Sequence, residues 1–326
     1  MYKITTENKQ LRKVFSETLL ELMTSNPDVI YLEADLSQAI GTSNLIRQKP
    51  EQAIDIGIME ANMIGVAAGM SLKGKIPFVH SFGTFATRRC ADQVFMSGCY
   101  NRANVKIIGS DPGVAAESNG GTHMPLEDIG VFRSFPEITI FDIAEPHLLR
   151  FVLKEVSKRY GMTYIRFPRK TDKSYYDNNQ DFEIGKGIVL REGSDVTIIA
   201  SGLEVYEALE AAEMLETMGI NAEVIDMFTI KPIDAELICT SAEKTGAVVT
   251  AENHNILGGL GSAVSEVLAE YCPVPMKRIG VRDHFGEVGD LNFLMNKYSM
   301  TSNHIVLAAK EVINRRSRKN CCSNLA

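Results

Sequence analysis

Short apolar runs, each about the length of one buried strand, recur through the first half of the chain and alternate with stretches of helical pattern. Residues 11–23 have amphipathic spacing, and the apolar, glycine-containing stretch from Met63 onward predicts a buried core helix. Such alternation predicts a mainly parallel sheet covered by helices on both faces. The predicted strands are 29–33, 53–56, 76–79, 105–108, 138–141 and 163–167, with further helices at 84–102, 126–134 and 145–159.

A second α/β unit follows a polar stretch, rich in Lys, Asp, Asn, Tyr and Gln, that is typical of a linker. Its predicted strands are 196–200, 222–227, 247–251 and 276–281, and its predicted helices are 204–218, 234–244, 260–271 and 303–313. The predicted fold class is therefore α/β with two doubly wound domains. We place these domains at 1–170 and 187–314, the linker at 171–186, and a basic tail that we expect to be disordered at 315–326.

The composition of this 326-residue chain is that of a soluble globular protein, with 45% hydrophobic and 23% charged residues. A formal net charge of −7 gives no attractive field for nucleic acid, and the first residues lack the apolar core of a signal peptide. No run approaches the length that spans a membrane. The six cysteines are scattered without metal-site spacing, so we expect reduced thiols and a cytoplasmic protein without a nucleic-acid or membrane partner.

Glu60 is the first candidate for chemistry, because it lies between the short strand at 53–56 and the predicted core helix. An acidic residue in the first turn of a helix commonly does no more than complement the helix dipole. A desolvated carboxyl group in the same position can instead share a proton with a ligand. Position alone leaves both interpretations open.

Four motifs follow one another in an order that resembles the transketolase family. They are Asp35 in Leu-Glu-Ala-Asp-Leu-Ser, Gly57-Ile-Met-Glu60, Phe82-x-x-Phe85-Ala-Thr and Gly120-Gly-Thr-His123-Met-Pro-Leu-Glu. Each motif is weak alone, but their order and spacing, followed by a matching C-terminal domain, are specific. The chain looks like the C-terminal subunit of a split transketolase. This resemblance implies a thiamine-pyrimidine-binding domain followed by a smaller transketolase C-terminal domain, and a ketol-transferring enzyme.

The resemblance implies thiamine diphosphate as the cofactor. Glu60 matches the glutamate that hydrogen-bonds a ring nitrogen of the aminopyrimidine in this family, which makes it a catalytic and cofactor-binding candidate. Phe82 and Phe85 match the aromatic residues that wall the aminopyrimidine pocket, although two aromatics three apart are more often core. Asp35 and Arg88 complete the cofactor-binding candidates. Arg88 stands where split transketolases commonly have glycine, and it could be a solvated charge or reach the substrate channel.

On the substrate side, His123 matches a histidine that contacts the donor sugar near its reacting carbonyl, so we count it as catalytic and substrate-binding. Arg169 aligns with an arginine that binds the substrate phosphate, and a solvent-facing arginine is an equal alternative. The loop between them departs from the family pattern, because Asp111 replaces a histidine while Ser118 and Asn119 replace Glu-Asp. We therefore predict that Asp111 and Asn119 bind the substrate, and that an anionic, non-standard ketose is preferred over xylulose 5-phosphate.

Thiamine enzymes bind Mg²⁺ and the diphosphate through a Gly-Asp-Gly motif followed by an Asn, and this sequence does not contain such a pair. The resemblance therefore implies that an N-terminal transketolase subunit supplies the Mg²⁺ ligands and the diphosphate half of each site. It also implies a heterotetramer with two copies of each chain. We expect no metal ligand from this chain.

Other functions stay open on the sequence alone. The β-type subunit of a 2-oxo acid dehydrogenase, or a deoxyxylulose-phosphate-synthase-like enzyme, shares this domain pair, although the Gly-Gly-Thr-His motif and Arg169 favour ketose chemistry. A non-catalytic assembly subunit is the alternative of another class, and the presence of Glu60 argues against it. Residues 252–261 look at first like a phosphate-binding loop but lack the Walker spacing, so we interpret their glycines as tight helix–strand packing.

Overall fold

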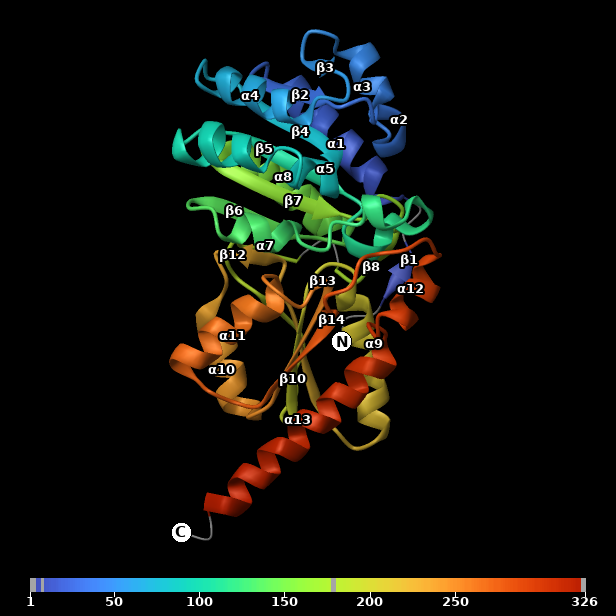
Figure 1. Ribbon diagram of the computed structural model, residues 1–326, viewed down its shortest axis with the longest axis vertical. Coiled ribbons are helices and arrows are strands. Elements are labelled where there is room, and N and C mark those ends of the chain that lie inside the picture. The colour runs from blue at the N-terminus through green and yellow to red at the C-terminus, as the bar shows by residue number, and fades with distance from the viewer. Residues whose placement is uncertain (1–3, 7–8, 177–179, 324–326) are drawn as a thin grey trace.

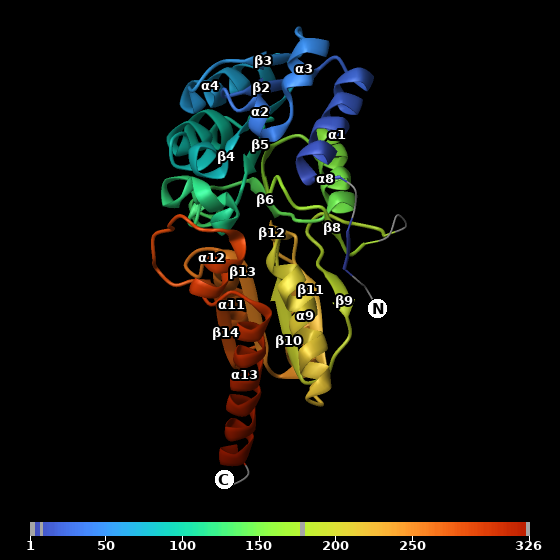
Figure 2. The same cartoon turned by 90° about the vertical axis from the view of Figure 1, so that its right-hand side faces the viewer.

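The computed structural model describes residues 4–6, 9–176 and 180–323, which form two α/β bodies placed end to end (Figure 1). Each body is a sheet with helices on both sides, as the alternation of strands and helices predicts. A view from the side shows the same two-body arrangement, with the last helix running along the second body (Figure 2).

The first body is built on a seven-stranded sheet with the strand order β12-β6-β7-β5-β4-β2-β3. The strands from the first half of the chain pair in parallel, whereas β12 runs antiparallel to β6. All six strands predicted for the first unit are present. The strands of this sheet are β2 (Val29–Glu33), β3 (Ala53–Asp55), β4 (Ile76–Phe82), β5 (Lys106–Ser110), β6 (Ile138–Asp142), β7 (Met162–Phe167) and β12 (Thr229–Lys231).

Successive residues of these strands face opposite helical layers, which explains why each strand has a continuous apolar run. Phe78 of β4 packs in the core cluster that contains α1 (Leu11–Ser25) and α8 (Pro146–Lys158). Its neighbour Val79 packs instead with α4 (Glu60–Ser71). Shorter helices in the connections are α2 (Ser37–Ile40), α3 (Ser43–Gln48), α5 (Gly83–Thr87), α6 (Ala91–Gln93) and α7 (Asp128–Arg133).

The second body contains a five-stranded sheet with the order β14-β13-β10-β11-β9, in which only the edge strand β9 is antiparallel. The strands are β9 (Ile188–Arg191), β10 (Val196–Ala200), β11 (Ala222–Asp226), β13 (Val248–Asn255) and β14 (Met276–Val281). Helices α10 and α11 contact each other on one side, and α9 contacts α13 on the other (Figure 1). The helices are α9 (Glu204–Thr217), α10 (Ala235–Thr245), α11 (Leu260–Tyr271), α12 (Leu291–Lys297) and α13 (Ser302–Ser323).

The structure corrects the expected tail. We expected a helix that ends at Ile313 and a disordered segment at 315–326, but α13 continues to Ser323, so this expectation is wrong for residues 315–323. Residues 324–326 lie outside the described part of the chain. A physical reason is Arg316, whose guanidinium donates to the carbonyl oxygens of Asp195 and Thr245 and so attaches the extended helix to the second body.

Other boundaries also differ from the prediction. The stretch 84–102 is not one helix, because α6 follows α5 after a break and leads into a π-helical segment, Val94–Tyr100. The linker contains β8 (Lys173–Ser174), which pairs antiparallel with β1 (Thr5–Thr6). Strand β12 comes from the second half of the chain but forms the edge of the first sheet, beside β6. The second half of the chain therefore contributes one strand to the first body.

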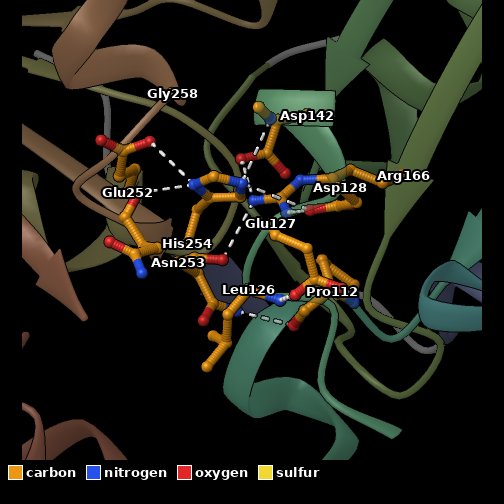
Figure 3. Close-up of polar contacts among 12 residues, drawn as sticks. Pro112, Leu126, Glu127, Asp128, Asp142, Arg166, Glu252, Asn253, His254 and Gly258 are labelled. Carbon is orange, nitrogen blue, oxygen red and sulfur yellow. Dashed lines mark hydrogen bonds and ion pairs between the residues drawn. The ribbon is translucent and has the colours of Figure 1, made fainter. Parts of the chain in front are cut away.

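A buried arginine joins the two bodies at their junction (Figure 3). Arg166 of β7 has no exposed surface, and its guanidinium donates to Asp128 at 2.8 Å and to Asp142 at 3.0 Å. It also donates to the backbone carbonyl of Asn253, in β13 of the second sheet, at 3.0 Å. Burial opposes the charged form, but the two carboxylates outweigh it and raise the pKa of Arg166 above its ordinary value. One guanidinium therefore links β6, β7 and α7 to the second body.

Removing this guanidinium should destabilise the chain, because two buried carboxylates would lose their counter-charge. We expect Arg166→Ala to lower the free energy of unfolding by about 3–5 kcal/mol, measured by urea denaturation followed by circular dichroism. Arg102→Ala is the control, because its 3.6 Å ion pair with Glu137 is exposed and should contribute little. Equal stability of Arg166→Ala and the wild type would show that the junction does not depend on this contact.

Candidate functional site

Three aromatic rings form a wall at the carboxyl edge of the first sheet, where β4 ends and α5 begins. The ring centroids of Phe82 and Phe85 are 6.3 Å apart. The His123 ring meets both edge-on, with its centroid 5.8 Å from Phe82 and 5.1 Å from Phe85. Phe82 is buried while Phe85 and His123 are half-buried, so this aromatic wall is partly open. The structure thus brings the predicted substrate-side histidine against the two predicted cofactor-side phenylalanines.

Glu60 lies next to the aromatic wall as the first residue of α4, and its side chain is 1% exposed. Ser81 Oγ donates a 2.9 Å hydrogen bond to Oε1, and Arg89 Nη1 donates a 2.8 Å hydrogen bond to Oε2. A carboxylate oxygen can accept two hydrogen bonds, so each oxygen keeps capacity for a further donor. The predicted buried position in the first turn of a core helix is confirmed.

Arg89 connects the Glu60 carboxyl group to the aromatic wall. Its guanidinium carbon lies 4.1 Å from the centre of the Phe85 ring, and its side chain is 43% exposed. The neighbouring Cys90 is buried, and this burial, together with the charge of Glu60, raises the pKa of its thiol to about 12. The site therefore offers a buried carboxyl group beside a flat apolar face, and Cys90 stays a protonated thiol.

Arg169 reaches the other side of the aromatic wall from the end of β7. Its guanidinium carbon is 5.1 Å from the centre of the Phe82 ring, and Nη1 donates to the carbonyl oxygen of Ala39 at 2.9 Å. Nε donates to Asp111 at 2.5 Å, and the backbone N–H of Arg169 donates to the other Asp111 oxygen at 3.1 Å. Both oxygens of Asp111 are thus bonded to Arg169, and the assignment of Asp111 to the substrate stays a prediction.

Arg88, one of the cofactor-binding candidates, bonds to groups around the turn of His123. Its Nε lies 2.8 Å from an oxygen of Glu127, and Nη2 donates to the Thr84 hydroxyl and, at 3.3 Å, to the Thr122 carbonyl oxygen. These contacts tie α5 to the turn that carries His123. The side chain is half exposed, and its assignment to the cofactor stays a prediction.

Asp35 and Asn119 lie apart from these contacts. Both side chains are exposed. Asp35 has a left-handed backbone with φ 60°, and its N–H donates to a carboxyl oxygen of Asp55 at 3.0 Å. Asn119 ends the 3₁₀ segment Gly113–Asn119. Their assignments to the cofactor and the substrate stay predictions.

A buried Glu33–His80 pair supports the site, and sequence reasoning missed it. Both side chains are fully buried, and His80 Nδ1 lies 3.0 and 3.1 Å from the two Glu33 oxygens. His80 Nε2 lies 3.0 Å from the hydroxyl of Ser110, so the contacts connect β2, β4 and β5 one residue before Ser81 and Asp111. Burial alone would raise the pKa of Glu33, but the charge of His80 and its hydrogen bond lower it. The presence of ionisable residues within otherwise apolar strands was the sequence signal that could have revealed this pair.

The glycine-rich stretch after Glu252 is closed to phosphate. The Glu252 carboxylate accepts hydrogen bonds from the N–H groups of Leu260 at 2.7 Å and Gly261 at 2.8 Å, which begin α11. These are the donors that an anion at the helix start would need. A Cβ atom at Gly259 would lie 1.9 Å from a Glu252 oxygen, so this close approach requires glycine. The geometry supports our interpretation of these glycines as tight packing.

Among residues 4–6, 9–176 and 180–323, no three His, Cys, Asp or Glu side chains are grouped so that they could hold a metal ion. Over the same described ranges, no helix combines the length and the apolar character that crossing a membrane requires.

Comparison with known proteins gives matches over nearly the whole chain. The family models for the transketolase pyrimidine-binding domain and the transketolase C-terminal domain match residues 7–172 and 185–305, respectively. A 6-deoxy-6-sulfo-D-fructose transketolase subunit of Clostridium sp. (strain MSTE9) is 47% identical over 97% of this chain and 98% of its own length. An apulose-4-phosphate transketolase subunit of Phocaeicola vulgatus is 35% identical over 93% of this chain and 97% of its own length.

A solved structure is similar over the same extent. It is a split-gene transketolase described as an inactive β4 tetramer, and it is 42% identical to this chain with a TM-score of 0.85. The alignment covers 94% of this chain and 98% of that one.

The lowered pKa of Glu33 predicts a pH-dependent contribution to stability. A carboxyl group whose pKa is lowered on folding stabilises the native state above its ordinary pKa of 4.5, and this stabilisation is lost as the pH falls through the lowered value. We expect Glu33→Gln to unfold at lower urea concentration than the wild type at neutral pH, with a difference that shrinks below pH 4.5. Glu51→Gln, at an exposed position, is the control. A difference that is constant with pH would exclude this linkage.

Proposed function

The chain belongs to the transketolase family, as the C-terminal subunit of a split enzyme that transfers a two-carbon ketol unit, and we propose that Glu60 and the aromatic wall hold the pyrimidine ring of thiamine diphosphate. The observation that carries this proposal is the Glu60 carboxyl group, which is 1% exposed and is bonded to Ser81, the residue before Phe82, and to Arg89, whose guanidinium lies over the Phe85 ring. A pyrimidine-binding domain in this family implies thiamine diphosphate as the cofactor.

The residues at the carboxyl edge fit an aminopyrimidine. A flat, weakly polar ring needs an apolar face and a hydrogen-bonding partner for its ring nitrogen. Phe82 and Phe85 supply the face, and each oxygen of Glu60 has one protein donor and room for another. When bound, thiamine diphosphate supplies the carbon nucleophile that ketol transfer requires.

The roles proposed for the protein side chains follow from these contacts. Glu60 shares a proton with the ring nitrogen, and the hydrogen bonds from Ser81 and Arg89 keep its carboxyl group in place. Phe85 excludes water from the ring. His123 Nδ1 lies 2.9 Å from the Thr122 hydroxyl, so Nε2 is the nitrogen that we propose faces the donor sugar.

The other half of the site belongs, in this proposal, to an N-terminal transketolase subunit. That subunit would supply the ligands of Mg²⁺ and the diphosphate, and two copies of each chain would form a heterotetramer. Two observations support this division. The sequence lacks the Gly-Asp-Gly and Asn pair, and the similar split-gene transketolase is described as an inactive β4 tetramer.

We further propose that the donor is an anionic, non-standard ketose. Two similar subunits are named for 6-deoxy-6-sulfo-D-fructose and for apulose 4-phosphate, both of which carry an anionic group. The departures from the family pattern at Asp111, Ser118 and Asn119 agree with a changed substrate. We take the sulfonated ketose as the first donor to test, because the subunit named for it is 47% identical to this chain.

Replacing Glu60 tests the cofactor side of this proposal. Glu60→Gln keeps the shape of the side chain but cannot share a carboxyl proton, so we expect kcat of the reconstituted two-subunit enzyme to fall by about 10²-fold or more. Glu236→Gln is a matched control, since Glu236 also lies in the first turn of a helix but its side chain is 84% exposed. Circular dichroism should show that both variants fold. Unchanged turnover of Glu60→Gln would remove this residue from the mechanism.

Reconstitution tests the partner and the donor together. With glycolaldehyde as acceptor, we expect no ketol transfer by the purified chain and transfer once an N-terminal subunit is added. Among donors, 6-deoxy-6-sulfofructose should exceed xylulose 5-phosphate in kcat/KM by about tenfold or more, because a site with changed polar groups rejects the standard donor. Transfer by the chain alone would refute the two-subunit site, and a clear preference for xylulose 5-phosphate would refute the proposed donor class.

A further inference from the structure

Arg169 contacts the aromatic wall on the side of Phe82, and its positive charge is already paired with a carboxylate of the protein. Arg169 is 11% exposed and its guanidinium lies over the Phe82 ring. The Asp111 carboxylate is 3% exposed and lies 2.5 Å from Nε of Arg169. Nη1 of Arg169 is bonded to a backbone carbonyl oxygen. An anionic group that meets this arginine therefore meets a guanidinium already paired with a carboxylate.

The position of Asp111 is fixed by more than the ion pair. Its backbone is left-handed, with φ 56°, and its N–H donates to the carbonyl oxygen of Phe167 at 3.0 Å. Its two oxygens accept from the backbone and from the side chain of Arg169. The carboxylate cannot turn away from the guanidinium without breaking these bonds, so the compensation of charge is built into the loop.

The cavity next to this pair is lined by more acidic than basic side chains. Asp111, Glu117, Lys170 and Asp172 are the ionisable residues that line a cavity of about 240 Å³. Lys170 forms an ion pair with Glu117. Arg169 and Lys170 thus each have a carboxylate of their own, and Asp172 adds a third acid. A second negative charge on a ligand would find no unpaired cation among these residues.

We propose that Asp111 is a specificity-determining residue that makes the site prefer a singly charged anionic group, such as a sulfonate, over a doubly charged phosphate ester. This inference rests on the proposed function, in which the donor is an anionic ketose. A phosphate monoester carries about −1.5 to −2 charges at pH 7, with a second pKa near 6. A sulfonate stays singly charged. Close, poorly solvated charges interact strongly, so the second charge next to Asp111 weakens binding.

The experiment compares two donors with the same carbon chain, 6-deoxy-6-sulfofructose and fructose 6-phosphate, in the reconstituted enzyme. Glycolaldehyde is the acceptor, because it is uncharged and leaves the donor as the only substrate with a charge. For the wild type, we expect kcat/KM of the phosphate donor, relative to the sulfonate donor, to rise by roughly tenfold between about pH 7.5 and 5.5, as the phosphate loses its second charge. Because this is a ratio within one enzyme, effects of pH on the protein that are common to both donors cancel.

The variant Asp111→Asn keeps the size of the side chain and one acceptor oxygen for Arg169. At about pH 7.5 it should raise the relative kcat/KM of the phosphate donor by about tenfold, and it should flatten the pH dependence of the ratio. Glu117→Gln is the comparison, because it removes one acid from the same cavity and leaves the Asp111–Arg169 pair intact. We expect a smaller change there.

The outcomes separate this inference from the proposed function. Transfer from the sulfonated donor, with a ratio that is flat with pH and unchanged in Asp111→Asn, would overturn the role of Asp111 and leave the proposed function standing. An equal effect of Glu117→Gln would assign the preference to the field of the whole cavity and would also overturn it. Transfer from neither donor, with transfer from an uncharged ketose, would overturn both. If Asp111→Asn does not fold, a wild-type ratio that is flat with pH still overturns the preference for a singly charged group.

Discussion

The guanidinium of Arg166 is a positive charge without solvent contact, and groups from both bodies are arranged around it as hydrogen-bond acceptors. Two carboxylates of the first body and one backbone carbonyl of the second surround the guanidinium. A buried ion pair is weak support for stability, because desolvation cancels much of the attraction. Its geometry is nevertheless restrictive, since the bonded Nη1 and Nη2 groups each need their acceptors in one place. We regard orientation of the two sheets as the main effect of Arg166.

The same junction reaches the site loop through Asn253. The carbonyl oxygen of Asn253 accepts from Arg166, while its side chain donates to the carbonyl oxygen of Pro112 at 2.8 Å and accepts from the N–H of Val114 at 2.9 Å. Gly113 between them has φ 52°, and a Cβ atom there would lie 2.1 Å from the Asn253 side chain. The second body therefore holds the loop that follows Asp111, although it contributes no ring to the aromatic wall.

The elements of the fold were readable because parallel strands buried on both faces leave a strong apolar signal. Glu60 was readable too, since its short strand, glycine and core helix are adjacent in the sequence. The pairing of Asp111 with Arg169 was not, because 58 residues separate them and their contact depends on the order of strands. The Glu33–His80 pair, 47 residues apart, was missed for the same reason. Strand β12 was missed because a three-residue strand is too short to show a periodic pattern of apolar and polar residues.

Strand β12 has a consequence for separating the two domains. It belongs to the second half of the chain but covers the edge of β6 in the first sheet (Figure 1). A chain cut at the boundary near residues 172–185 would lose β12 and leave backbone groups at the edge of β6 unpaired. The sheet of the first domain is therefore complete only when a strand of the second domain is attached to it.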